Sequence, residues 1–126
     1  INNIMTNAIN WFEIPVSDFN RAQKFYETIL AAEMPVMEAM GMKSAFFTVD
    51  LQSGAVGGCI IQGAGYEPSQ KGALVYLNGG DDLSVILNRV EAAGGKITLP
   101  KTPIGKNGFM AHFTDSEGNK IGLHSA

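Results

Sequence analysis

One pattern of residues occurs twice along this chain, and it restricts the folds that the chain can adopt. The apolar segment 11–16 leads through Ser17-Asp18 into an amphipathic stretch, and the apolar segment 74–78 leads through Asp81-Asp82 into a second one. Further extended segments, separated by turn residues, follow each amphipathic stretch. The pattern predicts a strand, a helix and three strands, written twice.

The two amphipathic stretches carry apolar residues at helical spacing. In the first these residues are Phe19, Ala22, Phe25, Tyr26, Ile29 and Leu30, and in the second they are Leu83, Ile86, Leu87 and Val90. This spacing predicts two helices that each bury one face. We expect Ser17 or Asp18 to cap the first helix by accepting a backbone N–H, and Asp81 or Asp82 to cap the second.

The extended segments predict three strands after each helix. They cover residues 35–39, 44–49 and 56–62 in the first copy, and residues 96–99, 108–114 and 120–124 in the second. A loop rich in turn residues separates the two copies. We therefore expect a single domain over residues 1–126, with module one at about 8–63, a linker at about 64–72 and module two at about 73–126.

The composition argues against several classes of function. The 126 residues are 45% hydrophobic and 17% charged, as in a globular domain with a substantial core. A net charge of −3 without a basic run argues against a nucleic-acid partner. No apolar stretch reaches the roughly 20 residues of a membrane span. The single Cys59 excludes an internal disulfide, which favours a cytoplasmic location. Because the chain begins at Ile1, Met5 is the expected natural start.

Two segments of the chain resemble sequences of the vicinal oxygen chelate superfamily, which includes glyoxalase I, extradiol dioxygenases and bleomycin- and fosfomycin-resistance proteins. The first is Glu13–Asp18 followed by Ala22 and Phe25-Tyr26, and the second is Asp115–Leu123. The chain is most similar to the small, single-domain, glyoxalase-like branch. The resemblance implies an α+β fold in which two βαβββ modules form a curled mixed sheet around a cleft, with the helices on the outer face. It also implies a homodimer, in which the partner often completes the cleft.

Side chains of a strand alternate between its two faces, which divides each predicted strand into core and cleft positions. Phe12, Ile14 and Val16 are expected to face the first helix, so Trp11 and Glu13 would face the cleft. The same alternation places in the cleft Tyr76, Asn78, His112, Gly122 and His124.

An aromatic wall for a flat ligand is expected from Trp11, Tyr76 and Phe47. The adjacent Phe46 and Phe47 must face opposite ways, and the sequence does not decide which of them faces the cleft. The residues expected to contact a ligand are therefore Trp11, Phe47, Tyr76, Asn78 and His112.

The resemblance implies four metal-ligand positions on the cleft faces of the strands. Three of them fall at Trp11, at Ala73 or Leu74, and at Gly122, where no side chain offers a metal donor. The fourth lies on the strand before the linker, where only Gln62 could serve. We therefore expect the usual metal site to be lost, and no other cofactor is implied.

Glu13 and His124 are the candidates for acid–base chemistry. A carboxylate on the cleft face beside Trp11 would be partly desolvated, which raises its pKa and suits proton transfer. The alternative is a solvated carboxylate paired with a basic side chain, and His124 could equally be a surface residue near the chain end. Together with His112, these two side chains could also form a different site for zinc or iron.

The missing metal donors and the aromatic cleft favour a metal-free protein that binds a small, partly aromatic organic molecule. Two enzyme alternatives stay open. One is a metal-independent isomerase or lyase that uses Glu13 and His124 as base and acid. The other is a metal-dependent lyase or dioxygenase with displaced ligands. A module that only mediates dimerisation is a further alternative, and the sequence does not name a reaction.

Overall fold

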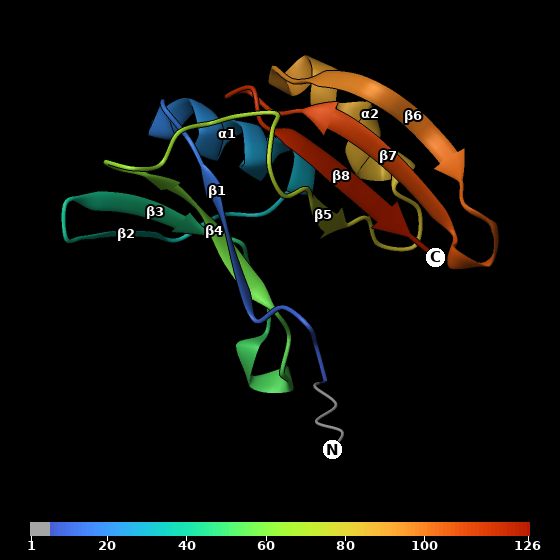
Figure 1. The fold of residues 1–126 in the computed structure, drawn as a ribbon, viewed down its shortest axis with the longest axis horizontal. Helices are drawn as coiled ribbons and strands as arrows, with labels where there is room; N and C mark the ends of the chain where they lie inside the picture. Colours follow the sequence, from blue (N-terminus) through green and yellow to red (C-terminus); the bar gives the residue numbers. More distant parts are fainter. Residues whose placement is uncertain (1–5) are drawn as a thin grey trace.

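The structure, a computed structural model that describes residues 6–126, contains the predicted elements in the predicted order (Figure 1). The first module consists of β1 (Trp11–Pro15), α1 (Phe19–Leu30), β2 (Val36–Ala39), β3 (Met42–Phe46) and β4 (Gly57–Gln62). The second consists of β5 (Val75–Asn78), α2 (Ser84–Ala93), β6 (Lys96–Pro103), β7 (Phe109–Thr114) and β8 (Lys120–Ser125). Short 3-10 helices at Leu51–Ser53 and Gly105–Asn107 precede β4 and β7. The expected start at Met5 lies outside the described residues.

Each module forms its own four-stranded mixed sheet, and the two sheets have the same strand order. The orders are β1-β4-β3-β2 and β5-β8-β7-β6. In each sheet the first strand pairs in parallel with the last, and the other pairs are antiparallel. The equivalent topology confirms the predicted α+β fold of two βαβββ modules, in which each sheet stays open.

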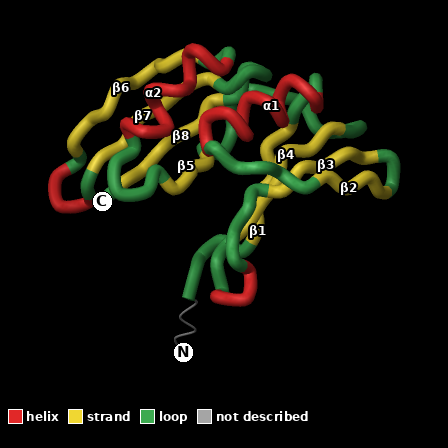
Figure 2. Tube along the Cα trace, turned by 180° about the vertical axis from the view of Figure 1, so that it is seen from behind, coloured by secondary structure: helices red, strands yellow, loops and turns green. Residues whose placement is uncertain are grey.

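Both helices lie on the same side of the strands. Figure 1 shows β6, β7 and β8 in front of α2, whereas the view from behind in Figure 2 shows both helices in front of the strands. The helices and sheets bury one apolar core, which includes Ile14, Phe25, Tyr26, Ile60, Leu87 and Phe113. No helix among residues 6–126 is long and apolar enough to cross a membrane.

The ends of the helices follow from local chemistry. Asp18 caps α1 by accepting the N–H of Arg21 at 3.1 Å, and the carboxylate of Asp82 accepts the N–H of Ser84 at 2.9 Å at the start of α2. Helix α2 ends at Gly94, where φ is +110°, a left-handed conformation that glycine adopts at little cost. The predicted alternatives at α1 therefore resolve to Asp18, whereas the prediction of Asp81 or Asp82 as the cap of α2 is wrong. The N-cap of α2 is Leu83, whose side chain makes no capping bond, and Asp82 precedes it.

Two strands differ from their predicted bounds by more than one residue. Strand β3 was expected at 44–49 but spans Met42–Phe46, because a tight turn at Met40-Gly41 pairs Ala39 with Met42. Strand β6 continues through Pro100 to Pro103, whereas the sequence predicted its end at Leu99. Since β6 is an edge strand with irregular pairing to β7, its prolines remove few ladder hydrogen bonds.

The turn between β7 and β8 holds the start of α1. The Glu117 side chain is fully buried, and its carboxylate accepts hydrogen bonds from the N–H groups of Ser17 and Asp18 at 3.1 and 2.7 Å. Arg21 Nε lies 2.7 Å from the same carboxylate. Burial alone would raise the pKa of Glu117, but hydrogen bonds from Arg21, Asp18, Ser116 and Ser17 outweigh it and lower the pKa to about 2.

Two further side chains of this turn reach the first module. The buried hydroxyl of Tyr26 donates to Asp115 at 2.6 Å, and the Asn119 amide donates to the carbonyl oxygen of Pro15 at 2.7 Å. Asn119 also accepts the N–H of Ser69 in the linker at 2.9 Å. The two segments that carry the family resemblance therefore bind each other across the modules.

Candidate functional site

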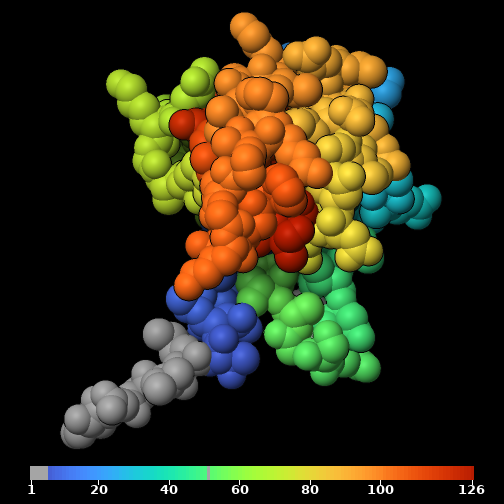
Figure 3. All heavy atoms as spheres, turned by 90° about the vertical axis from the view of Figure 1, so that its right-hand side faces the viewer, coloured from blue at the N-terminus to red at the C-terminus, as the bar shows by residue number. Residues whose placement is uncertain are grey.

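Within residues 6–126, no helix or strand covers the faces of the two sheets that point away from α1 and α2. The alternation predicted from the sequence is confirmed there, since Trp11, Glu13, Tyr76, Asn78 and His124 are exposed. Trp11 and Tyr76 are 39% and 44% exposed, so both aromatic side chains are available for contact on this face. In the space-filling view of Figure 3, the green residues before β4 project below the second module. We refer to the uncovered faces together as the open face.

Tyr76 and His112 form a hydrogen-bonded pair on the open face. The Tyr76 hydroxyl lies 2.7 Å from His112 Nε2, and their ring centroids are 5.6 Å apart. Burial and the charge of Lys120 lower the pKa of His112, which favours a neutral imidazole that can accept this bond. Gly122 lies opposite Tyr76 on β8, and the Tyr76 ring covers it. The pair thus offers an aromatic surface with a polar edge.

A shallow cavity lies beside this pair at the end of β5. Its volume is about 650 Å³, and its lining includes Tyr76, Asn78, Met110 and His124. His124 Nε2 lies 2.7 Å from the carbonyl oxygen of Asn107, so Nε2 is the donor in this bond. The predicted residues Tyr76, Asn78 and His124 therefore meet in one cavity, with His112 bonded to Tyr76.

The aromatic pair of the first module corrects one prediction. Trp11 packs beside Phe46 on the open face, with ring centroids 5.9 Å apart. Phe47, which was expected in the aromatic wall, is buried on the helix side against Phe12 and Tyr26. The physical reason is the register of β3: Ala45 and Phe47 face the core, so Phe46 faces outward.

Glu13 bonds to a residue that the sequence did not single out. The hydroxyl of Tyr66, in the linker, donates to the Glu13 carboxylate at 3.0 Å. This hydrogen bond and the charge of Glu13 raise the pKa of Tyr66. Tyr66 is the one aromatic residue of the linker 64–72, and this was the only feature of the sequence that could have pointed to it. Glu13 and His124 line different cavities, so the structure does not bring the predicted base and acid together.

The residues at the family's metal-ligand positions do not fit a metal. Trp11, Ala73 or Leu74, and Gly122 carry side chains without a metal donor. The side-chain amide oxygen of Gln62, Oε1, accepts the N–H of Phe19 at 2.8 Å, at the start of α1 and therefore on the helix side of the sheet. Gln62 was the remaining candidate, and its orientation removes it.

The alternative metal site from Glu13, His112 and His124 is wrong. Among residues 6–126, no three His, Cys, Asp or Glu side chains lie close enough together to hold a metal ion. Glu13 is instead paired with Tyr66, His112 with Tyr76 and His124 with the backbone of Asn107.

Comparisons with known proteins agree with this architecture. The family model of the Glyoxalase/Bleomycin resistance protein/Dioxygenase superfamily matches residues 8–123. A Mycobacterium bovis protein provisionally named a glyoxylase, CFP32, is 24% identical over 117 residues. The match covers 93% of this chain but 45% of that protein, so the chain spans less than half the length of this relative.

Solved structures show the same fold at low sequence identity. A glyoxalase/bleomycin resistance protein from Albidiferax ferrireducens has a TM-score of 0.70 at 16% identity, with 95% of this chain and 99% of that chain covered. The fosfomycin resistance protein FosX from Listeria monocytogenes has a TM-score of 0.65 at 17% identity, with 98% and 93% covered. A glyoxalase I variant from Zea mays has a TM-score of 0.72 at 18% identity, with 93% and 44% covered.

Proposed function

The chain belongs to the glyoxalase/bleomycin resistance protein/dioxygenase superfamily, and from that premise we propose that it binds a small, partly aromatic organic molecule on its open face without a bound metal. The observation that carries this proposal is the exposure of Trp11 and Tyr76 on the open face. Large exposed aromatic side chains beside polar groups are typical of ligand sites.

The polar groups near Tyr76 would orient the ligand. Tyr76 supplies a ring face, while Asn78 and His124 add hydrogen-bonding groups at the adjoining cavity. The neutral His112 holds the Tyr76 hydroxyl at 2.7 Å and so fixes the ring. These contacts favour a planar molecule with hydrogen-bonding substituents at its edge.

Binding is favoured over the acid–base enzyme that the sequence left open. Proton transfer requires that both groups reach the substrate within hydrogen-bonding distance. Glu13 lines a cavity of about 110 Å³ beside the linker, whereas His124 lines the cavity at the end of β5. One small ligand on either cavity would reach only one of the two.

We further propose that a second copy of the chain completes the site. Drug-sized ligands are usually buried over most of their surface, and an open sheet face covers only one side. Trp11, Met37 and Tyr76 are all at least 39% exposed and would lie in such an interface. Sedimentation velocity over a range of concentrations should therefore show a dimer, and ligand should shift the equilibrium toward it. A monomer at every concentration, with or without ligand, would contradict this part of the proposal.

Trp11 is the only tryptophan, so its emission reports directly on the open face. We expect aromatic ligands found in a binding screen to quench or shift this emission. Changing Tyr76 to Ala should weaken their binding about tenfold or more, which corresponds to about 1.4 kcal/mol. Fluorescence titration of both proteins measures the effect.

Val36→Ala is the matched control, because Val36 is 47% exposed but pairs with Ala45 on the helix side of the first sheet. Its binding constants should equal those of the unchanged protein. Ligands that bind equally well to the Tyr76→Ala protein and leave the Trp11 emission unaltered would refute a site on the open face.

A further inference from the structure

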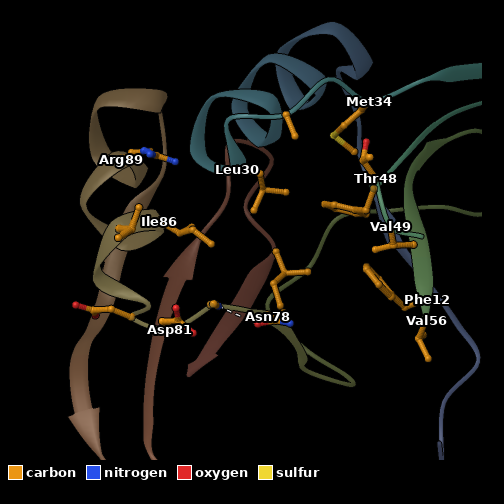
Figure 4. A pocket seen from close by; sticks show the side chains of 17 residues that line it. Phe12, Leu30, Met34, Thr48, Val49, Val56, Asn78, Asp81, Ile86 and Arg89 are labelled. Carbon is orange, nitrogen blue, oxygen red and sulfur yellow. Dashed lines mark hydrogen bonds between the residues drawn. The ribbon is translucent and has the colours of Figure 1, made fainter. Parts of the chain in front are cut away.

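A second cavity lies between the helix layer and the ends of the two sheets, and Asn78 and Gly80 separate it from the cavity at the end of β5 by lining both. Figure 4 shows Phe12 and Val56 on one wall, Ile86 of α2 on the other, and Leu30 and Met34 above them. The cavity has a volume of about 700 Å³, which is within the range of small-molecule sites. We call it the helix-side groove. Apart from Asn78 and Gly80, its lining residues take no part in the proposed site on the open face.

The floor of the helix-side groove is acidic. Asp81 and Asp82 line it in the loop between β5 and α2, and Asp81 is labelled in Figure 4. Asp82 is held ionised, because hydrogen bonds from Ser84 and Lys101 lower its pKa to about 2. Lys101 Nζ lies 3.0 Å from Asp82 and balances that charge. Among the described residues, Asp81 has no hydrogen-bonded or ionic partner of its own, so its negative charge is uncompensated.

The one basic side chain of the groove has a structural role. Arg89 Nη1 donates to the carbonyl oxygen of Ile29 at 3.0 Å, near the end of α1. The last carbonyls of a helix lack intrahelical partners and carry partial negative charge. Arg89 is therefore held at the helix end, and the lining of the groove carries two carboxylates, Asp81 and Asp82, against this one guanidinium.

We propose that the helix-side groove binds an organic cation, with an aromatic or aliphatic body between its apolar walls and an ammonium group directed at Asp81. The rings of Phe12 and Phe47 lie 5.3 Å apart at one wall and both line the groove. These rings would contact the apolar body of the ligand, while Asp81 receives its ammonium group. Neutral molecules would gain only the apolar contacts, and carboxylates would be repelled by Asp81.

Three probes of the same shape test this assignment. They are 4-phenylbutylamine, 4-phenylbutanol and 4-phenylbutanoate, titrated at pH 7 into the isotope-labelled protein and followed by NMR. We expect the amine to bind about tenfold or more tightly than the carboxylate, with the alcohol between them, and to shift the signals of groove residues such as Ile86. Equal affinities, tighter binding of the carboxylate or shifts confined to the open face would each overturn the proposal.

Two variants with matched controls locate the site. Val85 lines the groove and is 55% exposed, so Val85→Arg should fold normally and abolish amine binding, while Val36→Arg on β2 should leave it unchanged. Asp81→Asn should weaken the amine about fivefold without affecting the alcohol, and the exposed Glu67→Gln should affect neither. Amine binding that survives Val85→Arg overturns the proposal. A loss of self-association in the Val85→Arg protein, without amine binding to the unchanged protein, also overturns it, because the groove would then be a protein interface.

Discussion

Changing Glu117 to Gln is expected to lower the free energy of unfolding by about 2–3 kcal/mol. The side chain is fully buried, and its carboxylate accepts bonds from Ser17, Asp18 and Arg21. Glutamine keeps the shape but removes the charge, and its amide directs N–H groups at donors that need an acceptor. Because these bonds join the last turn of the second module to the start of α1, their loss weakens the contact between the modules. Urea unfolding at pH 7 measures the change.

The effect of Glu117 should depend on pH with a defined sign. Its pKa is about 2 in the folded protein against an ordinary 4.5, so the unfolded chain takes up the proton first as the pH falls. The contribution to stability is complete above about pH 4.5 and is lost as the pH falls toward 2. The stability difference between the unchanged protein and Glu117→Gln should therefore shrink between pH 5 and about pH 2.5.

The exposed Glu67 supplies the control for charge alone. Glu67→Gln should change the free energy of unfolding by less than about 0.5 kcal/mol at pH 7. If the difference in the free energy of unfolding between Glu117→Gln and the unchanged protein stays constant down to pH 2.5, these contacts do not lower the pKa of the Glu117 carboxylate.

Changing Gly122 to Ala is expected to disrupt the open-face site while the fold persists. A Cβ atom at this position would lie 2.5 Å from Cε1 of Tyr76, so the ring must move. The Tyr76 side chain is 44% exposed and can swing toward solvent, which spares the backbone of β5 and β8. The bond between Tyr76 and His112 is then lost, and ligand binding should weaken about tenfold, as for Tyr76→Ala.

NMR titration of His112 measures this displacement without a ligand. Burial is the first cause of its lowered pKa and the charge of Lys120 is the second. Moving the Tyr76 ring away exposes the imidazole, so the pKa of His112 should rise toward its ordinary value of 6.5. In Tyr76→Phe the ring still covers His112 and only the hydroxyl is missing, so the pKa should stay low. An unchanged titration of His112 in Gly122→Ala would show that Tyr76 does not respond to Gly122.

Positions that alternate along a single strand could be predicted because the rule is local. The burial of Ile14 beside the exposed Glu13, and of Leu77 beside the exposed Tyr76, follows from the two faces of a strand. The rule failed where two large apolar residues are adjacent, since either Phe46 or Phe47 can face the core. Only the pairing of β3 with β4 made that choice.

Gln62 shows a second limit of local reasoning. Its position at the end of β4 makes it a reasonable metal ligand by sequence, and its type supplies a donor atom. The N–H of Phe19 at the start of α1 uses that oxygen instead, although the two residues are 43 positions apart. An unsatisfied helix terminus is a strong competitor for a polar side chain, and its location is a property of the packed fold.

The sequence by itself determined the duplicated order of elements, both helix faces and the absence of donors at three of the family's metal positions, since these depend on residue type and short-range periodicity. Only the tertiary structure decided which side chains occupy the space around those positions. Gly122 provides the space in which the Tyr76 ring lies, and Tyr76 reaches His112, 36 positions away. Likewise, the bond of Tyr66 to Glu13 joins segments that are distant along the chain, and residues from both modules line the helix-side groove. Contacts of this kind depend on how the two modules pack, which no local pattern specifies.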